Sequence, residues 1–108
     1  MKISKLFPYH HQLEINLPNE EIMLSNFTLA EQQGILEFWE KCRGRIPDKM
    51  NEFEVDINQK QEELNNEMDF EKSCLLNEEI ASLASKVNDL WLWYRTQPFI
   101  SLRKDQDQ

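Results

Sequence analysis

The sequence predicts an all-α protein, a small helical bundle of three main helices with an extended N-terminal arm. Glycine occurs only twice in 108 residues, against a usual frequency of about 7%, and a β-rich domain needs more glycine for its turns. After residue 28, apolar residues recur every three or four positions, as in amphipathic helices. With 108 residues, of which 40% are apolar, one hydrophobic core is expected, and dimerisation is a second way to complete the bundle.

The N-terminal arm is predicted over residues 1–27 and packs on a helical domain over residues 28–108, so that the chain forms a single domain. Pro8 and Pro18 interrupt any long helix in the arm. Between them, apolar and polar residues alternate with period two, the pattern of an extended segment. The alternating apolar residues are Leu13, Ile15 and Leu17. Pro18 then starts a predicted short helical turn through Leu24.

The first helix is predicted over residues 29–43. Thr28 and Glu31 have the spacing of a capping box, in which each side chain bonds to the backbone N–H of the other residue. Gly44, followed by Pro47, marks the end of the helix. Its apolar residues form a broad stripe made of Leu29, Ile35, Leu36, Phe38, Trp39 and Cys42.

The second helix is predicted over residues 48–67, directly after Pro47. Its apolar residues recur at spacings of three, four and seven and are Ile46, Met50, Phe53, Ile57, Leu64 and Met68. The stripe is sparse, because Lys60 and Gln61 stand where another apolar residue is expected. On the other side of the helix, a row of acidic residues would span roughly 22 Å at 1.5 Å per residue. The row consists of Glu52, Asp56, Glu63 and Glu67.

The third helix is predicted over residues 74–97 and carries the most regular pattern. Its apolar seam follows heptad spacing and consists of Leu76, Ile80, Leu83, Val87, Leu90 and Tyr94. The register of the second helix would place an apolar residue at position 78, where Glu78 stands. We therefore expect a break between about Asn65 and Ser73. The alternative is one continuous helix of about 70 Å, which implies an elongated coiled-coil dimer.

The net charge of −8 arises in the middle of the chain. From Asp48 to Asp89 there are twelve acidic residues and four lysines, whereas the remaining charges cancel. An acidic surface repels phosphate backbones and anionic headgroups, so we expect no direct nucleic-acid binding and no membrane binding. The basic cluster Lys41, Arg43 and Arg45 lies at a predicted helix end, where cations favour the helix dipole.

The cysteines favour a reducing compartment and hence a cytoplasmic location. Cys42 and Cys74 have no CxxC spacing and no disulfide framework around them. Residues 1–12 lack the apolar run of a signal peptide. The longest uncharged stretch, residues 22–30, is too short to cross a bilayer.

We expect no enzyme activity, no catalytic residues, no metal and no cofactor. The sequence contains no Gly-rich phosphate loop, HExxH motif, zinc-ligand spacing or nucleophile elbow. His10 and His11 are adjacent, and adjacent side chains do not converge on one metal. Neither histidine follows a glutamate at the Glu-x-x-His spacing of carboxylate metal sites. The acidic pairs Glu62-Glu63 and Glu78-Glu79 are interpreted as a solvated face.

The end of the third helix is apolar on all sides. Leu90 and Tyr94 belong to the seam, whereas Leu92 faces away from it. Such a helix must be covered on more than one side, and three covers are open: the N-terminal arm, a second copy of the chain or another protein. Aromatic residues of this kind are common at protein interfaces. The predicted partner-binding residues are Trp91, Leu92, Trp93 and Phe99, with Arg95 and Arg103 at the rim.

These patterns favour a small acidic cytoplasmic protein–protein interaction module, acting as an adaptor, inhibitor or chaperone-like protein through its aromatic C-terminal helix. The partner is a protein of unknown identity or a second copy of the chain. The alternative is an acidic nucleic-acid mimic that inhibits a DNA- or RNA-binding protein. In that case the acidic row Glu52, Asp56, Glu63 and Glu67 would carry binding, with electrostatic steering.

Overall fold

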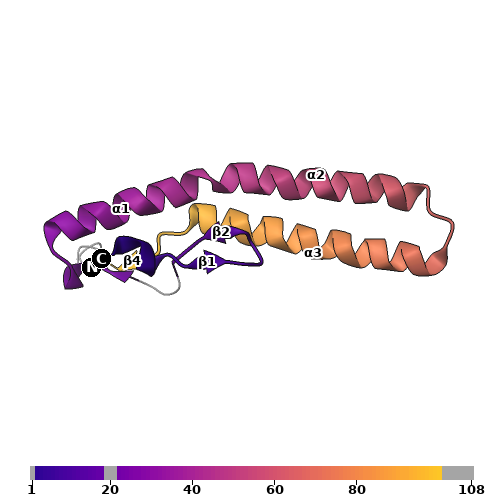
Figure 1. Ribbon diagram of the computed structural model, residues 1–108. Helices are drawn as coiled ribbons and strands as arrows, with labels where there is room; N and C mark the ends of the chain where they lie inside the picture. The colour runs from indigo at the N-terminus through magenta and orange to yellow at the C-terminus, as the bar shows by residue number, and fades with distance from the viewer. Residues whose placement is uncertain (1, 19–21, 101–108) are drawn as a thin grey trace, which may run out of the picture. The chain divides into compact units, whose positions relative to one another are not determined.

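The computed structural model describes residues 2–18 and 22–100 and is mostly helical, with a small strand region (Figure 1). The chain divides into two compact units, Met1–Arg45 with Arg95–Gln108 (the first unit) and Ile46–Tyr94 (the second unit). In chain order, the elements are η1 (Ile3–Leu6), β1 (Tyr9–His10), β2 (Ile15–Asn16), β3 (Ile22–Met23), η2 (Leu24–Asn26), α1 (Leu29–Gly44), α2 (Ile46–Asn65), α3 (Phe70–Arg95) and β4 (Phe99–Ile100), where η denotes a 3₁₀ turn. The predicted division between an arm and a helical domain stays a prediction.

The N-terminal segment of the first unit folds back on itself as a short hairpin. Strands β1 and β2 pair antiparallel, with His10 opposite Ile15. Glu14 closes the turn in a left-handed conformation, with φ 59°, and its N–H donates to the His10 carbonyl at 2.7 Å. The alternating residues predicted to be extended are all buried, at 3%, 4% and 2% exposure for Leu13, Ile15 and Leu17. The alternation therefore identified a buried face, whereas the hairpin itself was not predicted.

A second strand pair joins two distant segments of the first unit. Strand β3 pairs in parallel with β4, so that Ile22 lies opposite Phe99, and the Ile22 N–H donates to the Pro98 carbonyl at 3.1 Å. The helical turn predicted from Pro18 to Leu24 falls partly on residues 19–21, which lie outside the described residues. At Ile22–Met23 this prediction is wrong, because pairing with β4 holds the backbone extended.

Aromatic side chains form the core of the first unit around α1. Phe7 is fully buried, and its ring centroid lies 4.9 Å from that of Phe38 and 6.4 Å from that of Trp39. Phe99 contacts Trp39 edge-on at 6.5 Å between centroids, a favourable geometry for aromatic pairs. Helix α1 therefore carries the surface on which the segments from both ends of the chain pack.

Helix α1 begins and ends close to the predicted residues. The Thr28 Oγ1 accepts from the Glu31 N–H at 3.1 Å, and the Thr28 N–H donates to the Glu31 Oε1 at 2.9 Å. This confirms the predicted capping box. The apolar stripe is only partly buried, because Leu29 and Leu36 are 82% and 40% exposed.

In the second unit, α2 and α3 run antiparallel and are joined by residues 66–69 (Figure 1). This confirms the predicted break, and the alternative of one continuous helix is wrong. Helix α3 begins at Phe70, four residues before the predicted start, because the Asp69 Oδ1 accepts from the Glu71 N–H at 2.9 Å and caps the helix. It ends at Arg95, two residues before the predicted end at residue 97. Pro98 disfavours the helical conformation of the residue that precedes it, so the helix stops before that residue.

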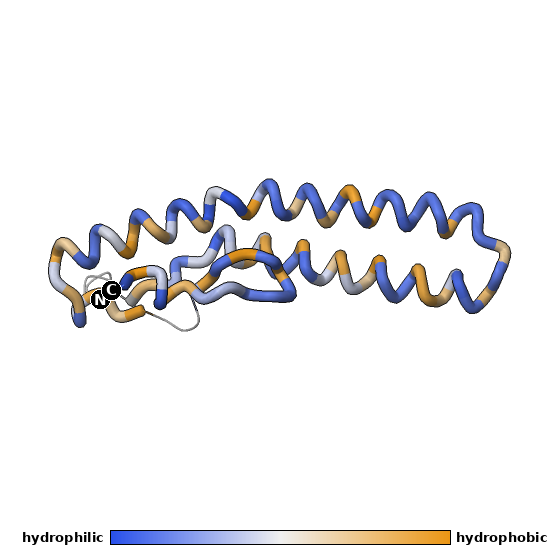
Figure 2. The backbone as a smooth tube through the Cα atoms, in the orientation of Figure 1, coloured by the Kyte–Doolittle hydropathy of each residue, from blue (hydrophilic) through white to orange (hydrophobic). Residues whose placement is uncertain are grey.

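The seam of α3 lies on the buried side of the helix. Leu76, Leu83 and Leu90 are at most 9% exposed. Lys60 of α2 reaches across to Glu79 of α3, with 3.1 Å between Nζ and Oε1, and the Lys86 Nζ lies 5.6 Å from the centroid of the Phe53 ring. Figure 2 shows that α2 is largely hydrophilic, whereas apolar residues recur along α3. A single bundle of three helices is not confirmed, because α1 belongs to the first unit and α2 and α3 to the second.

The two glycines should respond differently to alanine. An added Cβ at Gly44 meets no atom within 4 Å, whereas one at Gly34 would lie 2.5 Å from the Ile3 Cδ1. Neither glycine has a positive φ. Because alanine favours helix over glycine, we expect Gly44→Ala to raise the free energy of unfolding by about 0.5–1 kcal/mol. Gly34→Ala should raise the free energy of unfolding less, because the Ile3 side chain must move away from the added Cβ. Urea denaturation measures both, and equal gains would contradict the packing of η1 on α1.

The ion pair between Lys60 and Glu79 predicts a pH-dependent stability. Hydrogen bonding to Glu79, aided by its charge, raises the pKa of Lys60. The stabilisation is therefore fully present below the pKa of an unfolded lysine, about 10.4, and is lost as the pH rises through the folded pKa. We expect Glu79→Gln to lower the free energy of unfolding at neutral pH, by an amount that shrinks above about pH 10.4. Urea denaturation over a pH series tests this.

The matched control for that experiment is Glu78→Gln, because Glu78 is the exposed neighbour of Glu79 in the same helix. If both variants lose the same free energy of unfolding with the same pH dependence, the loss comes from the removed charge and not from the pair between Lys60 and Glu79.

Candidate functional site

The last turns of α3 present two large apolar side chains to solvent. Trp91 and Leu92 are 46% and 48% exposed, although Leu90 beside them is fully buried. Trp93 and Tyr94 are half-buried. Successive residues of a helix point about 100° apart, so the exposed pair covers a broad sector of the helix surface. We call Trp91, Leu92 and Trp93 the aromatic surface.

The aromatic surface is held in a defined arrangement. The Trp91 ring stacks on the Tyr94 ring, with 6.0 Å between centroids and 11° between planes. The two residues are three positions apart, which places them on the same side of the helix. A side chain that is already ordered loses less conformational entropy when a partner binds it.

The fourth predicted contact residue, Phe99, is buried. Phe99 is 2% exposed and belongs to β4 of the first unit, where it packs on Trp39. Its ring is therefore covered within the first unit, and its predicted role in partner binding stays a prediction. Its burial follows from the pairing of β4 with β3, which no local pattern indicates. Of the predicted rim residues, Arg95 is exposed, and Arg103 lies outside the described residues.

The predicted acidic row is shorter on the helix than expected. Glu52, Asp56 and Glu63 are exposed on α2, but Glu67 is half-buried and lies beyond the end of α2. Glu52 is paired with Lys49 at 2.9 Å. The Glu67 Oε2 accepts from the Asp69 N–H at 3.0 Å. Glu52 and Glu67 are thus engaged within the chain, and Asp56 and Glu63 interact with the charge of Lys60, which reduces the negative potential available to a partner.

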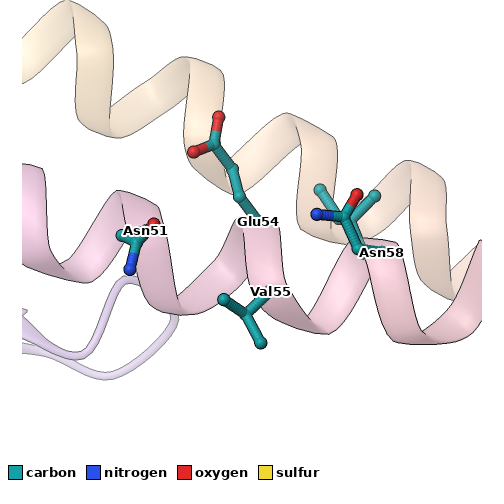
Figure 3. Close-up of a pocket in the computed structure, with 5 residues that line it drawn as sticks. Asn51, Glu54, Val55 and Asn58 are labelled. Carbon is teal, nitrogen blue, oxygen red and sulfur yellow. The ribbon is translucent and has the colours of Figure 1, made fainter.

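A shallow pocket on α2 was not predicted. It has a volume of about 340 Å³ and is lined by Asn51, Glu54, Val55, Ile57 and Asn58 (Figure 3). Its polar lining consists of two amides and one carboxylate. These groups can form hydrogen bonds with a polar ligand. They include no nucleophile and no acid–base pair of the kind that catalysis needs.

Two strongly exposed apolar residues that the sequence analysis did not single out lie between α2 and α3. Met68 is 97% exposed and Phe70 is 80% exposed. Met68 was predicted to belong to the buried stripe of the second helix. That prediction is wrong, because α2 ends at Asn65 and the helical register does not extend to residue 68. The signal that could have found these residues is their position in the predicted break.

Both histidines make contacts within the hairpin of the first unit. The Leu13 N–H donates to the His10 Nδ1 at 3.2 Å, and the Tyr9 ring contacts His11 edge-on at 5.0 Å. Over residues 2–18 and 22–100, no three side chains of His, Cys, Asp or Glu are arranged to hold a metal ion. Within the same ranges, no helix is both long and apolar enough to span a membrane.

No family model matches the sequence, and neither the curated proteins nor the solved structures include a significant match to it. The proposal below therefore depends on the geometry of the described residues.

The two cysteines should differ in reactivity. Both are free, Cys42 buried and Cys74 exposed. Burial raises the pKa of the Cys42 thiol, and the nearby Arg45 only partly opposes this effect. Because the thiolate is the reactive form, we expect iodoacetamide at neutral pH to modify Cys74 at least about tenfold faster than Cys42. Mass spectrometry of a time course measures both rates. The difference should disappear in denaturant, and equal rates in the native protein would contradict the burial of Cys42.

Proposed function

We propose that this protein is a helical protein–protein interaction module that binds its partner through the aromatic surface of α3. The observation that carries the proposal is the exposure of nearly half of both Trp91 and Leu92, side by side on one helix. Exposed apolar clusters on a folded protein mark contact surfaces, and tryptophan is the residue most enriched among those that dominate binding energy.

Binding would occur by burial of apolar surface against the partner. Trp91 and Leu92 act as anchors, and Trp93 supports them from its half-buried position. Arg95, exposed at the end of the same helix, lies at the rim, where charges affect association rate and orientation more than affinity.

A binding role fits the distribution of polar groups better than catalysis does. Across the described part of the chain, the buried side chains are apolar except for the Cys42 thiol, whose pKa is raised by burial, whereas a nucleophilic cysteine has a lowered pKa. The two free cysteines are consistent with a cytoplasmic location, which we propose on this basis.

A second copy of the chain is a candidate partner. Two paired helices bury only one seam, and further helices would be needed to complete a bundle. Leu75 on α3 and Val55 on α2 remain 56% and 46% exposed. We propose that a dimer would cover part of this surface.

The alternative function, an acidic mimic of nucleic acid, is supported by the exposure of Glu52, Asp56 and Glu63 along α2. We rank it second, because Lys49 pairs with Glu52 and Glu67 turns back to the chain. A mimic needs unpaired negative charge at a regular spacing along its surface.

The test is affinity capture of partners from cells that express the protein. We expect the double variant Trp91→Glu/Leu92→Glu to bind the partner about tenfold more weakly or worse. Truncating or charging an anchor residue costs on the order of 2 kcal/mol of binding free energy. Both side chains are about half-exposed, so the fold should survive, and circular dichroism checks this. Light scattering of both proteins shows whether the lost partner is a second copy.

The matched control is Met23→Glu/Leu36→Glu, which adds the same charge at side chains of similar exposure, 43% and 40%, that belong to no proposed contact surface. Loss of the partner in this control as well would show that added charge, and not the aromatic surface, is responsible. A third variant, Glu52→Gln/Asp56→Asn/Glu63→Gln, tests the mimic. If only this variant loses its partner, and the partner binds nucleic acid, the ranking of the two functions is reversed.

A further inference from the structure

The connection between α2 and α3 exposes apolar side chains to an unusual degree. Met68 and Phe70 are 97% and 80% exposed, more than Trp91 or Leu92. They are separated by one residue in the sequence, and each is flanked on both sides by an acidic residue. We call Met68, Phe70 and the adjacent acids Glu67, Asp69 and Glu71 the hairpin tip.

The exposure of these side chains does not come from a loosely held loop. The Asn66 and Glu67 N–H groups donate to the Glu63 and Leu64 carbonyls at 3.1 and 3.2 Å, so the last turn of α2 is closed by hydrogen bonds. The Asp69 N–H then donates to the Glu67 Oε2 at 3.0 Å.

The first turn of α3 is fixed in the same way. The Asp69 side chain accepts from the Glu71 N–H at 2.9 Å, and the Asp69 carbonyl accepts from the Ser73 N–H at 3.0 Å. Phe70 is thereby held in the first turn of a capped helix, with its ring in solvent. A binding element that is ordered before association loses less entropy when it binds.

The charge around the tip determines which partner can accept it. Residues 66–72 contain three carboxylates and one lysine, and Glu62 and Glu63 lie in the preceding turn of α2. A second hairpin tip would bring like charges together, which is unfavourable. The anionic surface of a bilayer would repel the same carboxylates.

We propose that the hairpin tip inserts Met68 and Phe70 into an apolar pocket of another protein that is bordered by lysine or arginine side chains. Methionine adapts to pockets of irregular shape, and a ring of basic residues would complement the carboxylates and speed association. This second surface has a different chemistry from the aromatic surface.

The two surfaces are separated along α3. From Phe70 to Trp91 the helix rises about 30 Å at 1.5 Å per residue. A small partner bound at one surface would therefore leave the other accessible. The inference does not depend on the proposed function, and each surface can be tested alone.

Cys74 provides a reporter for the test. It is exposed, whereas Cys42 is buried, and it lies four residues after Phe70, on the same side of α3. An environment-sensitive fluorophore attached to Cys74 therefore reports on contacts at the tip. Mass spectrometry confirms that only this cysteine is labelled.

The probe is a short synthetic helical peptide of leucine and lysine, which presents an apolar face bordered by basic side chains. We expect the peptide to change the fluorescence of the labelled full-length chain and to bind several-fold more weakly when salt rises from about 50 to about 300 mM. A peptide with glutamate in place of lysine should not bind. Met68→Ser/Phe70→Ser should weaken binding of the lysine peptide by about tenfold or more, although this variant keeps every carboxylate.

The matched control is Leu29→Ser/Leu36→Ser, which removes two exposed apolar side chains of α1 that belong to neither surface and should bind the lysine peptide as the wild type does. Equal binding by wild type and the tip variant would overturn the proposal, as would loss of binding in the Leu29 variant alone. A fluorescence change on phosphatidylcholine vesicles but not on the peptide, abolished by the tip substitutions, would assign the tip to lipid and also overturn it. Both variants are compared with the wild type by circular dichroism before titration.

Discussion

The turn capped by Asp69 is the constraint on which the second unit depends. Helix α2 carries few apolar residues, and its best-buried seam residue after Ile46 is Phe53. A helix of this kind is marginal on its own and needs tertiary packing. By accepting from the Glu71 N–H, Asp69 starts α3 at Phe70. The seam of α3 is then paired with α2, and Met68 and Phe70 are left outside both helices' buried sides.

The small number of apolar residues on α2 explains why two lysines make contacts between α2 and α3. Lys60 stands where an apolar residue was expected, and the structure shows its ammonium paired with Glu79. Lys86 places its ammonium near the Phe53 ring. In both cases the aliphatic stem can cover apolar surface while the charge stays near solvent. A polar contact within a seam can also fix the register between helices, since sliding α3 by one turn would separate Lys60 from Glu79.

Features determined by neighbouring residues could be predicted from the sequence, and features determined by distant residues could not. The capping box at Thr28 and the spacing of the α3 seam depend on residues three or four positions apart. The structure confirms the capping box by its hydrogen bonds, and it buries Leu76, Leu83 and Leu90 of the seam, whereas Ile80, Val87 and Tyr94 are half-buried. The pairing of β3 with β4 joins two-residue strands far apart in the chain. A strand of two residues is too short to show a recognisable alternation of apolar and polar residues, so the burial of Phe99 could not be predicted.

The same distinction applies to the surfaces. Trp91 and Leu92 could be singled out because the end of α3 is apolar on all sides, a local property. Met68 was misplaced by an error of only two residues in the end of α2, which converts a buried position into one that is 97% exposed. The acidic residues around the tip disfavour contact of one tip with another, because like charges repel. If the tip binds a partner as proposed, that charge favours a basic surface, whereas the aromatic surface, with Arg95 exposed at its end, has no such preference. The two proposed contact surfaces would therefore differ in selectivity although both would bind by burying large apolar side chains.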